Sequence, residues 1–569
     1  MSTFASTQNL KLLDYLPPSA NHIVELGCGD GSLGQEFKCL NPNAHYIGFE
    51  PRAELLTLAQ KQLDQVYGGA LEDLDLPRLG IVGPIDCLLI HAARLDLDAW
   101  QRLLPRILKK LSPTGQVLFV LENPIYVQHF LALLQGQNQE IAFPLKSLVD
   151  ALPSLNLHVD LILAEITDLK DFPKDEAFAD LTKAYVNFCQ NQKLAIYSNI
   201  FAKRFLVRTC LSQPPQRFIL RTIIGEMITS RVRLTEPNTF IQSSLGVVYK
   251  ELFRNDKIVL ETVAQPKAVI FQRLLFRDSP WAEPFLKSIR DAGYLLVYEM
   301  DDNPHIWDTA FALSRGIEFL ASHAVQVSTE PLADFVRNFN PHVLLFKNHL
   351  RTLPKEKDYT STYPVTLFFG ALNRQADWQS IIDPLNVVLR RYGNKVRVKV
   401  IWDLDFFKAL DTEAKEFVGR SDNYIIPYEE YTKILHSSDI ALLPLGDTPI
   451  NRMKSDLKFI EAAGHGCVAI ASPTVYAQSI RDGRTGFIYN SPLEFMKVLS
   501  FLIENPERRH ETAAQAYDYV RRHRLLASHY TERLDAYLNL YKELPKLEEE
   551  VKARVALWQK KKGPLVADF

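Results

Sequence analysis

The sequence predicts an α/β protein made of three doubly wound domains, in which helices cover both faces of a parallel sheet. Short apolar runs of strand length alternate with helix-length segments along most of the chain, and this alternation favours parallel sheets. Two of the predicted strands lead directly into glycine turns, at Gly27 and at Gly370. A chain of 569 residues is long enough for about three to five domains.

The composition is that of a globular protein in a reducing compartment. Hydrophobic residues make up 47% of the chain and the net charge is −2, so no basic field favours a nucleic-acid partner. The six cysteines include no Cys-x-x-Cys pair, which argues against a disulfide framework or a zinc site. Neither a signal pattern nor an apolar run of about 18 residues is present. We therefore expect a cytoplasmic protein, with membrane contact limited to the periphery of the inner face.

Residues 1–215 are predicted to form the first domain, which opens with a nucleotide-binding turn. Residues 21–34 predict a strand, a glycine loop and a helix, and the strand at residues 45–50 ends on Glu50. Glycines let the backbone approach an adenosine cofactor, and the acid accepts hydrogen bonds from the ribose hydroxyls. Residues 29–34 also fit the G-x-G-x-x-G pattern of dinucleotide sites. The residues alone therefore leave two cofactors open.

The run Glu25-Leu-Gly-Cys-Gly-Asp-Gly31 resembles motif I of class I S-adenosylmethionine-dependent methyltransferases. This resemblance favours S-adenosylmethionine over NAD, and the cofactor-binding residues that it implies are Glu25, Gly27, Gly29, Asp30 and Glu50. Residues 69–77 resemble the adenine loop of the same enzymes, but Ala70 replaces their usual aspartate. A methyltransferase whose activity is weakened or vestigial is therefore an alternative. His91, directly after a predicted strand at residues 85–90, is either structural or a base that faces the methyl acceptor.

The second domain, residues 216–355, is predicted from a further alternation of strands and helices. The expected strands are residues 232–234, 267–271, 294–298, 324–328 and 343–346, with helices at 281–292, 308–320 and 331–338. An acidic cluster, Glu299, Asp301 and Asp302, follows one strand. Three carboxylates could hold a divalent cation, cap a helix or bind the hydroxyls of an acceptor, and we expect the last of these and no metal.

The third domain, residues 356–541, carries strands expected at 364–370, 396–401, 440–445 and 468–471. Residues 454–464 predict a helix that ends at glycines. Lys454, Lys458 and Glu461 have the spacing of one helical face, so two ammonium groups could neutralise a diphosphate while the carboxylate binds ribose hydroxyls. A surface Lys–Glu pair is the alternative interpretation.

The run Lys458-Phe-Ile-Glu-Ala-Ala-Gly-His-Gly-Cys-Val-Ala-Ile-Ala-Ser472 resembles the donor-site helix of GT-B glycosyltransferases in the family 4-like group, where the glutamate binds the donor ribose. Residues 298–304 and 479–488 resemble two more loops of that group. The resemblance implies that the second and third domains form a GT-B pair, so that all three domains are Rossmann-like. It further implies transfer of a hexose, with retained configuration, from a nucleotide diphosphate sugar to a glycan, lipid-linked or protein acceptor.

The implied site has two sets of residues. They are Asp301, Asp302 and Lys454 for catalysis, and Gly370, Asn373, Arg374, Lys458 and Glu461 for donor binding. One departure is Met453, which stands where many members of the group carry a second glutamate that contacts the sugar. That contact would then come from Asn451 or Lys454.

We favour the interpretation that the chain joins two enzymes, a glycosyltransferase and a methyltransferase that acts on the same glycan. A non-catalytic scaffold in glycan assembly is the alternative, and Met453 and Ala70 favour it. In the tail, residues 542–569, the apolar stripe of Leu547, Val551, Val555 and Trp558 predicts a helix. That helix either docks on the enzyme body or on a second copy, or lies in a membrane interface.

Overall fold

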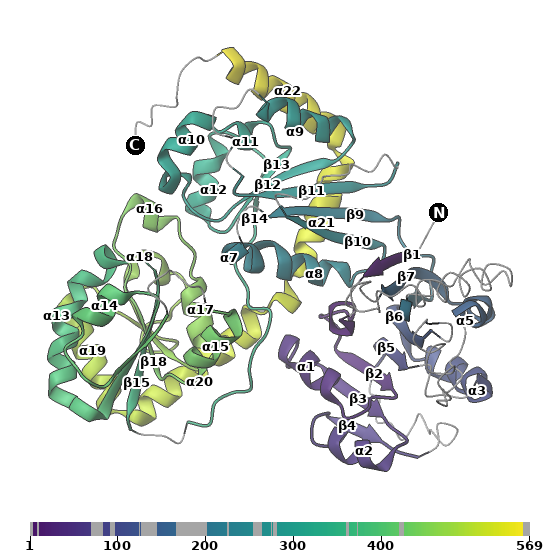
Figure 1. Ribbon diagram of the computed structural model, residues 1–569, viewed down its shortest axis with the longest axis horizontal. Coiled ribbons are helices and arrows are strands. Elements are labelled where there is room, and N and C mark those ends of the chain that lie inside the picture. Colours follow the sequence, from purple (N-terminus) through teal and green to yellow (C-terminus); the bar gives the residue numbers. More distant parts are fainter. Residues whose placement is uncertain are drawn as a thin grey trace, which may run out of the picture. The chain divides into compact units, whose positions relative to one another are not determined.

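The computed structural model describes residues 4–7, 11–69, 83–91, 97–123, 126, 145–166, 202–224, 227–253, 264–274, 276, 281–359, 363–372, 374–419 and 426–560. The chain forms two compact units. The first comprises Met1–Arg217 and Gln242–Val248, and the second comprises Phe218–Ile241 and Tyr249–Phe569. One sheet of eight strands and two sheets of six strands carry the fold (Figure 1). The predicted α/β class with three largely parallel sheets is confirmed.

The first unit is built on the eight-stranded sheet, with the order β1-β7-β8-β6-β5-β2-β3-β4. Its strands are β1 (Phe4–Thr7), β2 (His22–Leu26), β3 (His45–Phe49), β4 (Gln65–Tyr67), β5 (Ile85–His91), β6 (Leu111–Glu122), β7 (His158–Ile166) and β8 (Ala202–Cys210). Its helices include α1 (Ser32–Leu40), α2 (Ala53–Ala59), α3 (Leu97–Leu108) and α5 (Leu145–Ala151). Only β8 is antiparallel to its neighbours. The order reverses between β2 and β5, which is where open α/β sheets bind ligands.

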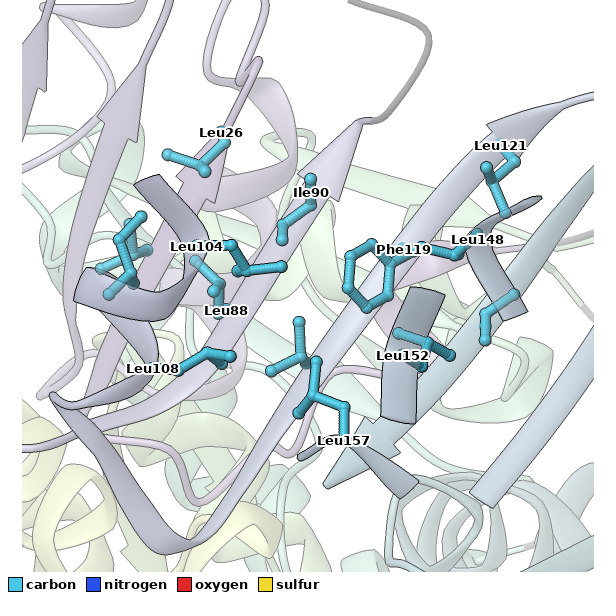
Figure 2. Close-up of a cluster of buried hydrophobic side chains, with 14 of the residues drawn as sticks. Leu26, Leu88, Ile90, Leu104, Leu108, Phe119, Leu121, Leu148, Leu152 and Leu157 are labelled. Atoms are coloured by element: carbon cyan, nitrogen blue, oxygen red, sulfur yellow. The ribbon is translucent and has the colours of Figure 1, made fainter. Parts of the chain in front are cut away.

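One face of this sheet packs on α3 and α5 (Figure 2). Leu88 and Ile90 of β5 and Phe119 of β6 point to this face, because side chains two positions apart on a strand share a side. Leu104 of α3 and Leu148 of α5 pack against them. Burying one such side chain stabilises the fold by about 1.5–3 kcal/mol, so this core holds the strand ends of the predicted cofactor site in place.

The second sheet, all but the start of β10 in the second unit, has the order β10-β9-β11-β12-β13-β14. Its strands are β9 (Phe218–Ile224), β10 (Val247–Phe253), β11 (Lys267–Gln272), β12 (Leu295–Met300), β13 (Ala324–Val327) and β14 (Val343–Leu345). The helices beside it are α7 (Met227–Ser230), α8 (Glu236–Gln242), α9 (Ala282–Asp291), α10 (Asp308–Ser314), α11 (Ile317–Leu320) and α12 (Glu330–Arg337). The strands β9 and β11–β14 pair in parallel.

The strand predicted at residues 232–234 is wrong. Residues Arg231–Thr235 form a helical turn between α7 and α8, because Arg233 turns inward and its Nε lies 2.6 Å from Oε1 of the buried Glu299. Three residues are too few to separate a strand from a helix by periodicity. Two strands of this sheet were not predicted, namely β9, Phe218–Ile224, which follows the proline break at residues 214–215, and β10, Val247–Phe253.

The third sheet has the order β17-β16-β15-β18-β19-β20, with all pairs parallel. Its strands are β15 (Val365–Gly370), β16 (Val396–Ile401), β17 (Lys415–Val418), β18 (Ile440–Leu443), β19 (Val468–Ala471) and β20 (Phe487–Ile488). Its helices are α13 (Gln375–Tyr392), α14 (Leu404–Ala409), α15 (Tyr428–His436), α16 (Pro449–Arg452), α17 (Leu457–Gly464), α18 (Pro473–Tyr476), α19 (Pro492–Glu504) and α20 (Pro506–His523). This strand order is that of the dinucleotide-binding fold and reverses between β15 and β18.

Helices cover both faces of the third sheet (Figure 1). Leu367 and Phe369 of β15 pack with α13, α14 and α19, whereas Phe368 between them packs with α15, α17 and α20. The strand Val365–Gly370 is buried at every position and is a nearly continuous apolar run. Val396–Ile401 was recognisable instead from its alternation, with Arg397 exposed and Lys399 half-buried between buried valines.

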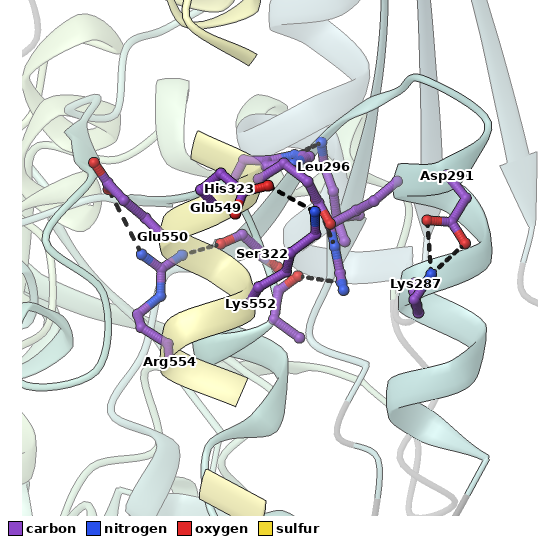
Figure 3. Close-up of polar contacts among 12 residues, drawn as sticks. Lys287, Asp291, Leu296, Ser322, His323, Glu549, Glu550, Lys552 and Arg554 are labelled. Atoms are coloured by element: carbon purple, nitrogen blue, oxygen red, sulfur yellow. Dashed lines mark hydrogen bonds and ion pairs between the residues drawn. The ribbon is translucent and has the colours of Figure 1, made fainter. Parts of the chain in front are cut away.

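The C-terminal helices are α21 (Tyr530–Lys542) and α22 (Leu544–Lys560), and both pack on the domain of the second sheet. Val551 of α22 is fully buried there. Arg554 Nη2 donates to the Ser322 carbonyl at 2.8 Å (Figure 3). Glu548 Oε2 lies 3.1 Å from His323 Nε2. The predicted tail helix is thus docked on the body of the second unit. Among the described residues, no helix has both the length and the apolar character needed to cross a bilayer.

Candidate functional site

A cavity of about 410 Å³ lies in the second unit, at the carboxyl ends of β15 and β18. This is the point at which the strand order of the third sheet reverses, the usual ligand position in doubly wound folds. Six of the residues named from the sequence line it, namely Asp301, Asp302, Gly370, Arg374, Lys454 and Lys458. They come from segments far apart in the chain, and the fold brings them to the same cavity.

Gly370 ends β15 at the floor of the cavity. A Cβ added there would lie 2.6 Å from Phe368 Cζ and 3.2 Å from Tyr431 Cε2, so the position has no room for a side chain. Arg374 follows and precedes the first turn of α13, and its Nη1 donates to Asp377 Oδ2 at 3.2 Å. A helix N-terminus next to an arginine suits an anion. Asn373, between these two residues, lies outside the described residues.

The predicted helix at residues 454–464 is shorter than expected, because α17 begins at Leu457. The Lys454 amide donates to the Asn451 carbonyl at 3.1 Å, which closes the last turn of α16, and the chain then turns before α17 starts. Lys454 therefore does not share a helical face with Lys458. Instead, its Nζ lies 2.9 and 3.0 Å from the two carboxylate oxygens of Asp302.

Glu461 is not part of a surface ion pair, since only 3% of it is exposed. Tyr431 donates to its Oε2 at 3.0 Å and Tyr428 donates to its Oε1 at 3.2 Å. Burial and the charge of Glu461 raise the pKa of Tyr431 well above its usual value, so this phenol stays protonated and donates. Lys458 Nζ donates to the Tyr431 hydroxyl at 3.0 Å and lies 3.6 Å from Glu461 Oε2. The carboxylate is thus behind the cavity wall, connected to it through Lys458.

Each carboxylate of the acidic cluster has its own cation. Glu299 is fully buried against Arg233, and burial raises its pKa although Arg233 opposes that shift. Asp301 Oδ1 accepts from Arg273 Nε at 2.6 Å, and Asp302 pairs with Lys454. Asp302 also accepts from the amide of the next residue, Asn303, at 3.0 Å. Among the described residues, no three or more His, Cys, Asp or Glu side chains are grouped so as to hold a metal ion.

Asn451 and Lys454, the two residues proposed to replace the missing glutamate, have different surroundings. Asn451 is buried, and its Nδ2 donates to Asp377 Oδ1 at 2.9 Å and to the Gly446 carbonyl at 3.0 Å. Met453 packs against the core of the second-sheet domain, and its carbonyl accepts from Thr329 Oγ1 at 2.8 Å. Of the two residues, Lys454 lines the cavity, whereas Asn451 is not among the residues that line it.

Sequence reasoning missed several residues around the cavity, and four of them bear on its chemistry. They are Arg273, Asn348, Trp402 and Ser455. Asn348 Nδ2 donates to Ser455 Oγ at 2.8 Å, and Arg273 is ion-paired with Asp301. No local pattern marks them, but Arg273 and Trp402 each directly follow a strand, β11 and β16, at the edge where ligands bind.

In the first unit, the predicted strand and helix are present as β2 and α1, and the glycine loop joins them. Gly27 and Gly29 have φ values of 85° and 64°, in the left-handed region that glycine adopts without strain. The Gly29 amide donates to Glu50 Oε2 at 2.7 Å. Arg52 Nε donates to Glu50 Oε1 at 2.6 Å from a side chain that is 51% exposed. Ribose hydroxyls could therefore take the place of Arg52 at this carboxylate.

The other predicted cofactor residues have different surroundings. Asp30 Oδ1 accepts from the Ser32 amide at 3.1 Å, which ties the loop to α1 and lowers the pKa of Asp30. Glu25 is buried, with Tyr46 Oη at 2.8 Å and His91 Nε2 at 2.7 Å. Glu25 thus anchors His91 beneath the loop. The predicted adenine loop, including Ala70, lies outside the described residues except for Gly69.

Residues 382–539 match the model of a protein family described as glycosyl transferase-like. The resemblance predicted for the C-terminal region is confirmed over these residues, which include Lys454, Lys458 and Glu461. A comparison with curated proteins finds no match.

Among solved structures, the chain is similar to TarM, with 13% identity, 48% of this chain and 54% of that chain covered, and a TM-score of 0.37. The chain therefore spans about half the length of that structure. A sucrose-phosphate synthase from Thermosynechococcus elongatus is 10% identical, with 57% and 100% covered and a TM-score of 0.40. An S-adenosylmethionine-dependent methyltransferase from Archaeoglobus fulgidus is 12% identical, with 35% and 89% covered and a TM-score of 0.26.

Proposed function

We propose that the second unit transfers a hexose from a nucleotide diphosphate sugar to a glycan, lipid-linked or protein acceptor. The observation that carries this proposal is the cavity at the strand-order reversal of the third sheet, which six residues named from the sequence line. The family match over residues 382–539 supports it. The resemblance stated above further implies that the anomeric configuration is retained.

The chemistry proposed for this cavity is electrostatic. Lys458, Arg374 and the first turn of α13 would hold the leaving diphosphate, and their positive charge would stabilise it as the bond to the sugar breaks. Asp301 and Asp302, which line the same cavity, would bind acceptor hydroxyls. Preorganised charges of this kind act without the reorganisation that water would need.

The first unit is proposed to be an S-adenosylmethionine-dependent methyltransferase that acts on the same glycan. The left-handed glycine loop and the exchangeable contact between Arg52 and Glu50 fit an adenosine cofactor. Bound there, S-adenosylmethionine would supply an electrophilic methyl group. In that arrangement Glu50 binds the ribose, the loop amides face the cofactor, and Glu25 orients His91. A shared chain raises the local concentration of a common acceptor, and mass spectrometry of the product made with both cofactors should detect a methylated glycan.

A thermal-shift panel of nucleotide sugars, S-adenosylmethionine and NAD tests both assignments on the full chain. A ligand at 100 times its dissociation constant stabilises its site by about 2.7 kcal/mol. We expect shifts with a nucleotide sugar and with S-adenosylmethionine, and Lys458→Ala should remove only the first. Absence of any nucleotide-sugar shift, together with no release of nucleotide diphosphate in a hydrolysis assay, would favour the non-catalytic scaffold that the Met453 departure allows.

A further inference from the structure

Trp402 has an unusual backbone and an unpaired side chain. It follows β16 with a φ of 70°, in the left-handed region that is rare for a bulky residue and persists only where the surrounding structure imposes it. Its indole Nε1 is buried and has no hydrogen-bond partner in the part of the chain that the structure describes. The indole N–H can only donate, so the fold alone leaves this donor unused.

Trp402 belongs to an aromatic shelf that it forms with Tyr431 and Tyr428. The rings of Trp402 and Tyr431 are stacked, with centroids 5.7 Å apart and planes 5° from parallel. Tyr431 and Tyr428 stack at 5.7 Å and 27°. Of these three rings, Trp402 is the one that lines the cavity. Lys458 Nζ lies 4.6 Å from the Tyr431 centroid and 5.9 Å from the Trp402 centroid, so the shelf adjoins the cationic wall.

The cavity therefore has a cationic part and an aromatic part next to each other. A nucleoside diphosphate has the matching order, with an anionic group at one end and a flat heterocycle at the other. Aromatic side chains bind such heterocycles by stacking, largely regardless of which base is present. An unused N–H donor adds a preference, because uracil and guanine present a carbonyl oxygen where cytosine and adenine present an amino group.

We propose that Trp402 contacts the base of the sugar donor and selects a keto base, uracil or guanine, over cytosine and adenine. This inference rests on the proposed function, since it places the donor nucleotide in the cavity. On this proposal, the strained backbone of Trp402 places the indole beside the cavity, and donation from Nε1 to the base carbonyl supplies the partner that the fold lacks. A small rotation of the ring on binding would bring the N–H out of its buried position.

Calorimetric titration of the full chain with UDP, GDP, CDP, ADP and inorganic pyrophosphate tests the proposal. We expect UDP or GDP to bind about tenfold or more tightly than CDP and ADP, and to change the tryptophan fluorescence. Trp402→Ala should weaken binding of the preferred nucleotide by about 10- to 100-fold and leave pyrophosphate binding unchanged. Trp402→Phe keeps a ring but removes the donor, so it should keep most of the affinity and lose most of the base preference. Trp281→Phe, which changes a 57% exposed residue, is the control for fluorescence.

The outcomes separate the two levels of inference. If nucleoside diphosphates bind Trp402→Ala as tightly as the wild type, or if Trp402→Phe keeps the full preference, the base-contact proposal is wrong while the donor site stands. If neither the nucleotides nor pyrophosphate bind the wild type, the proposed function is wrong and the inference is overturned with it. Melting curves show whether each variant is folded, and Trp402→Phe keeps the proposal testable if Trp402→Ala does not fold.

Discussion

Lys454 Nζ bridges both carboxylate oxygens of Asp302, at 2.9 and 3.0 Å, although the two residues are 152 positions apart in the chain. Each side chain is 17% exposed, and both line the cavity. Desolvation makes such a pair sensitive to the loss of either member, because the remaining charge is left without a partner. The two residues should therefore act as one unit.

We expect Asp302→Asn and Lys454→Met each to lower the turnover of sugar transfer by about 10²-fold. The double variant should resemble either single variant, because each single change already breaks the pair. Initial rates with a saturating nucleotide sugar measure this. Arg452→Met is the control, since Arg452 forms an exposed pair with Asp447 (62% and 61% exposed) and such pairs contribute little. Additive losses in the double variant would show that the two residues act separately.

Lys458 and Glu461 should differ in what their loss affects. Lys458 is 36% exposed, so Lys458→Ala should leave the melting temperature nearly unchanged but reduce turnover by about 10²-fold. Glu461 is buried and accepts hydrogen bonds from two tyrosine hydroxyls. Glu461→Ala should therefore destabilise the protein by about 1–3 kcal/mol and also weaken donor binding. Lys433→Ala, on the exposed side of α15, is the matched control. Normal transfer by Lys458→Ala would show that the donor site lies elsewhere.

This expectation corrects the one that the sequence supports by itself. Spacing predicts a surface pair between Lys458 and Glu461, and removing it should then leave stability unchanged. The burial of Glu461 depends on Tyr428 and Tyr431, which lie about 30 residues earlier. A contact over that separation has no signature in local spacing.

The fold was easier to predict than the pairings. Strands such as Ile440–Leu443 and Val468–Ala471 are continuous apolar runs, whereas Val396–Ile401 alternates apolar and polar residues, and both signals are local. Cavity residues such as Lys458 could be predicted because they lie in runs that resemble motifs of a known family. What could not be predicted is which cation meets which carboxylate, and the left-handed backbone at Trp402, because both depend on segments that meet only in the folded chain.

The glycine loop of the first unit provides a test of its cofactor. Valine at position 29 would have to adopt a φ of 64°, which is strained for a β-branched residue, at the position whose amide donates to Glu50. We expect Gly29→Val to weaken S-adenosylmethionine binding by at least about 100-fold in calorimetry, a loss of about 2.7 kcal/mol. Nucleoside diphosphate binding by the second unit should persist and serves as the control for folding. Heat from NAD but not from S-adenosylmethionine in the wild type would contradict the assignment.

Glu318 should give the second unit a pH-dependent stability. Burial raises its pKa from 4.5 to about 7, and the hydrogen bond from Ser314 Oγ at 2.9 Å opposes that shift only in part. Below pH 4.5 the group is neutral in both the folded and the unfolded chain. As the pH rises toward 7, the unfolded chain ionises first, so the free energy of unfolding falls.

Urea unfolding near pH 5 and near pH 7.5 should show this loss, which is at most about 3 kcal/mol for one group with this shift. Glu318→Gln cannot ionise, so its stability should change less between the two pH values than that of the wild type. Glu330→Gln, at a side chain that is 61% exposed, should leave the pH dependence as it is in the wild type. Equal slopes for wild type and Glu318→Gln would show that Glu318 ionises normally in the fold.

Two residues of α22 separate a docked tail from a membrane helix. Val551 is fully buried in the core of the second-sheet domain, whereas Leu557, further along the same helix, is 62% exposed. Val551→Ala should therefore destabilise the second unit by roughly 1–3 kcal/mol in urea unfolding. Leu557→Ala should change stability by less than about 0.5 kcal/mol.

If α22 were an interfacial helix, its exposed apolar residues would bind the membrane, so Leu557→Ala would weaken membrane binding. Sedimentation with phosphatidylglycerol vesicles tests this for the wild type and both variants. We expect Leu557→Ala to leave any vesicle binding unchanged, since the apolar stripe of α22 is already buried against protein. A loss of vesicle binding in Leu557→Ala, with no loss of stability in Val551→Ala, would mean that α22 leaves the body of the enzyme to bind lipid.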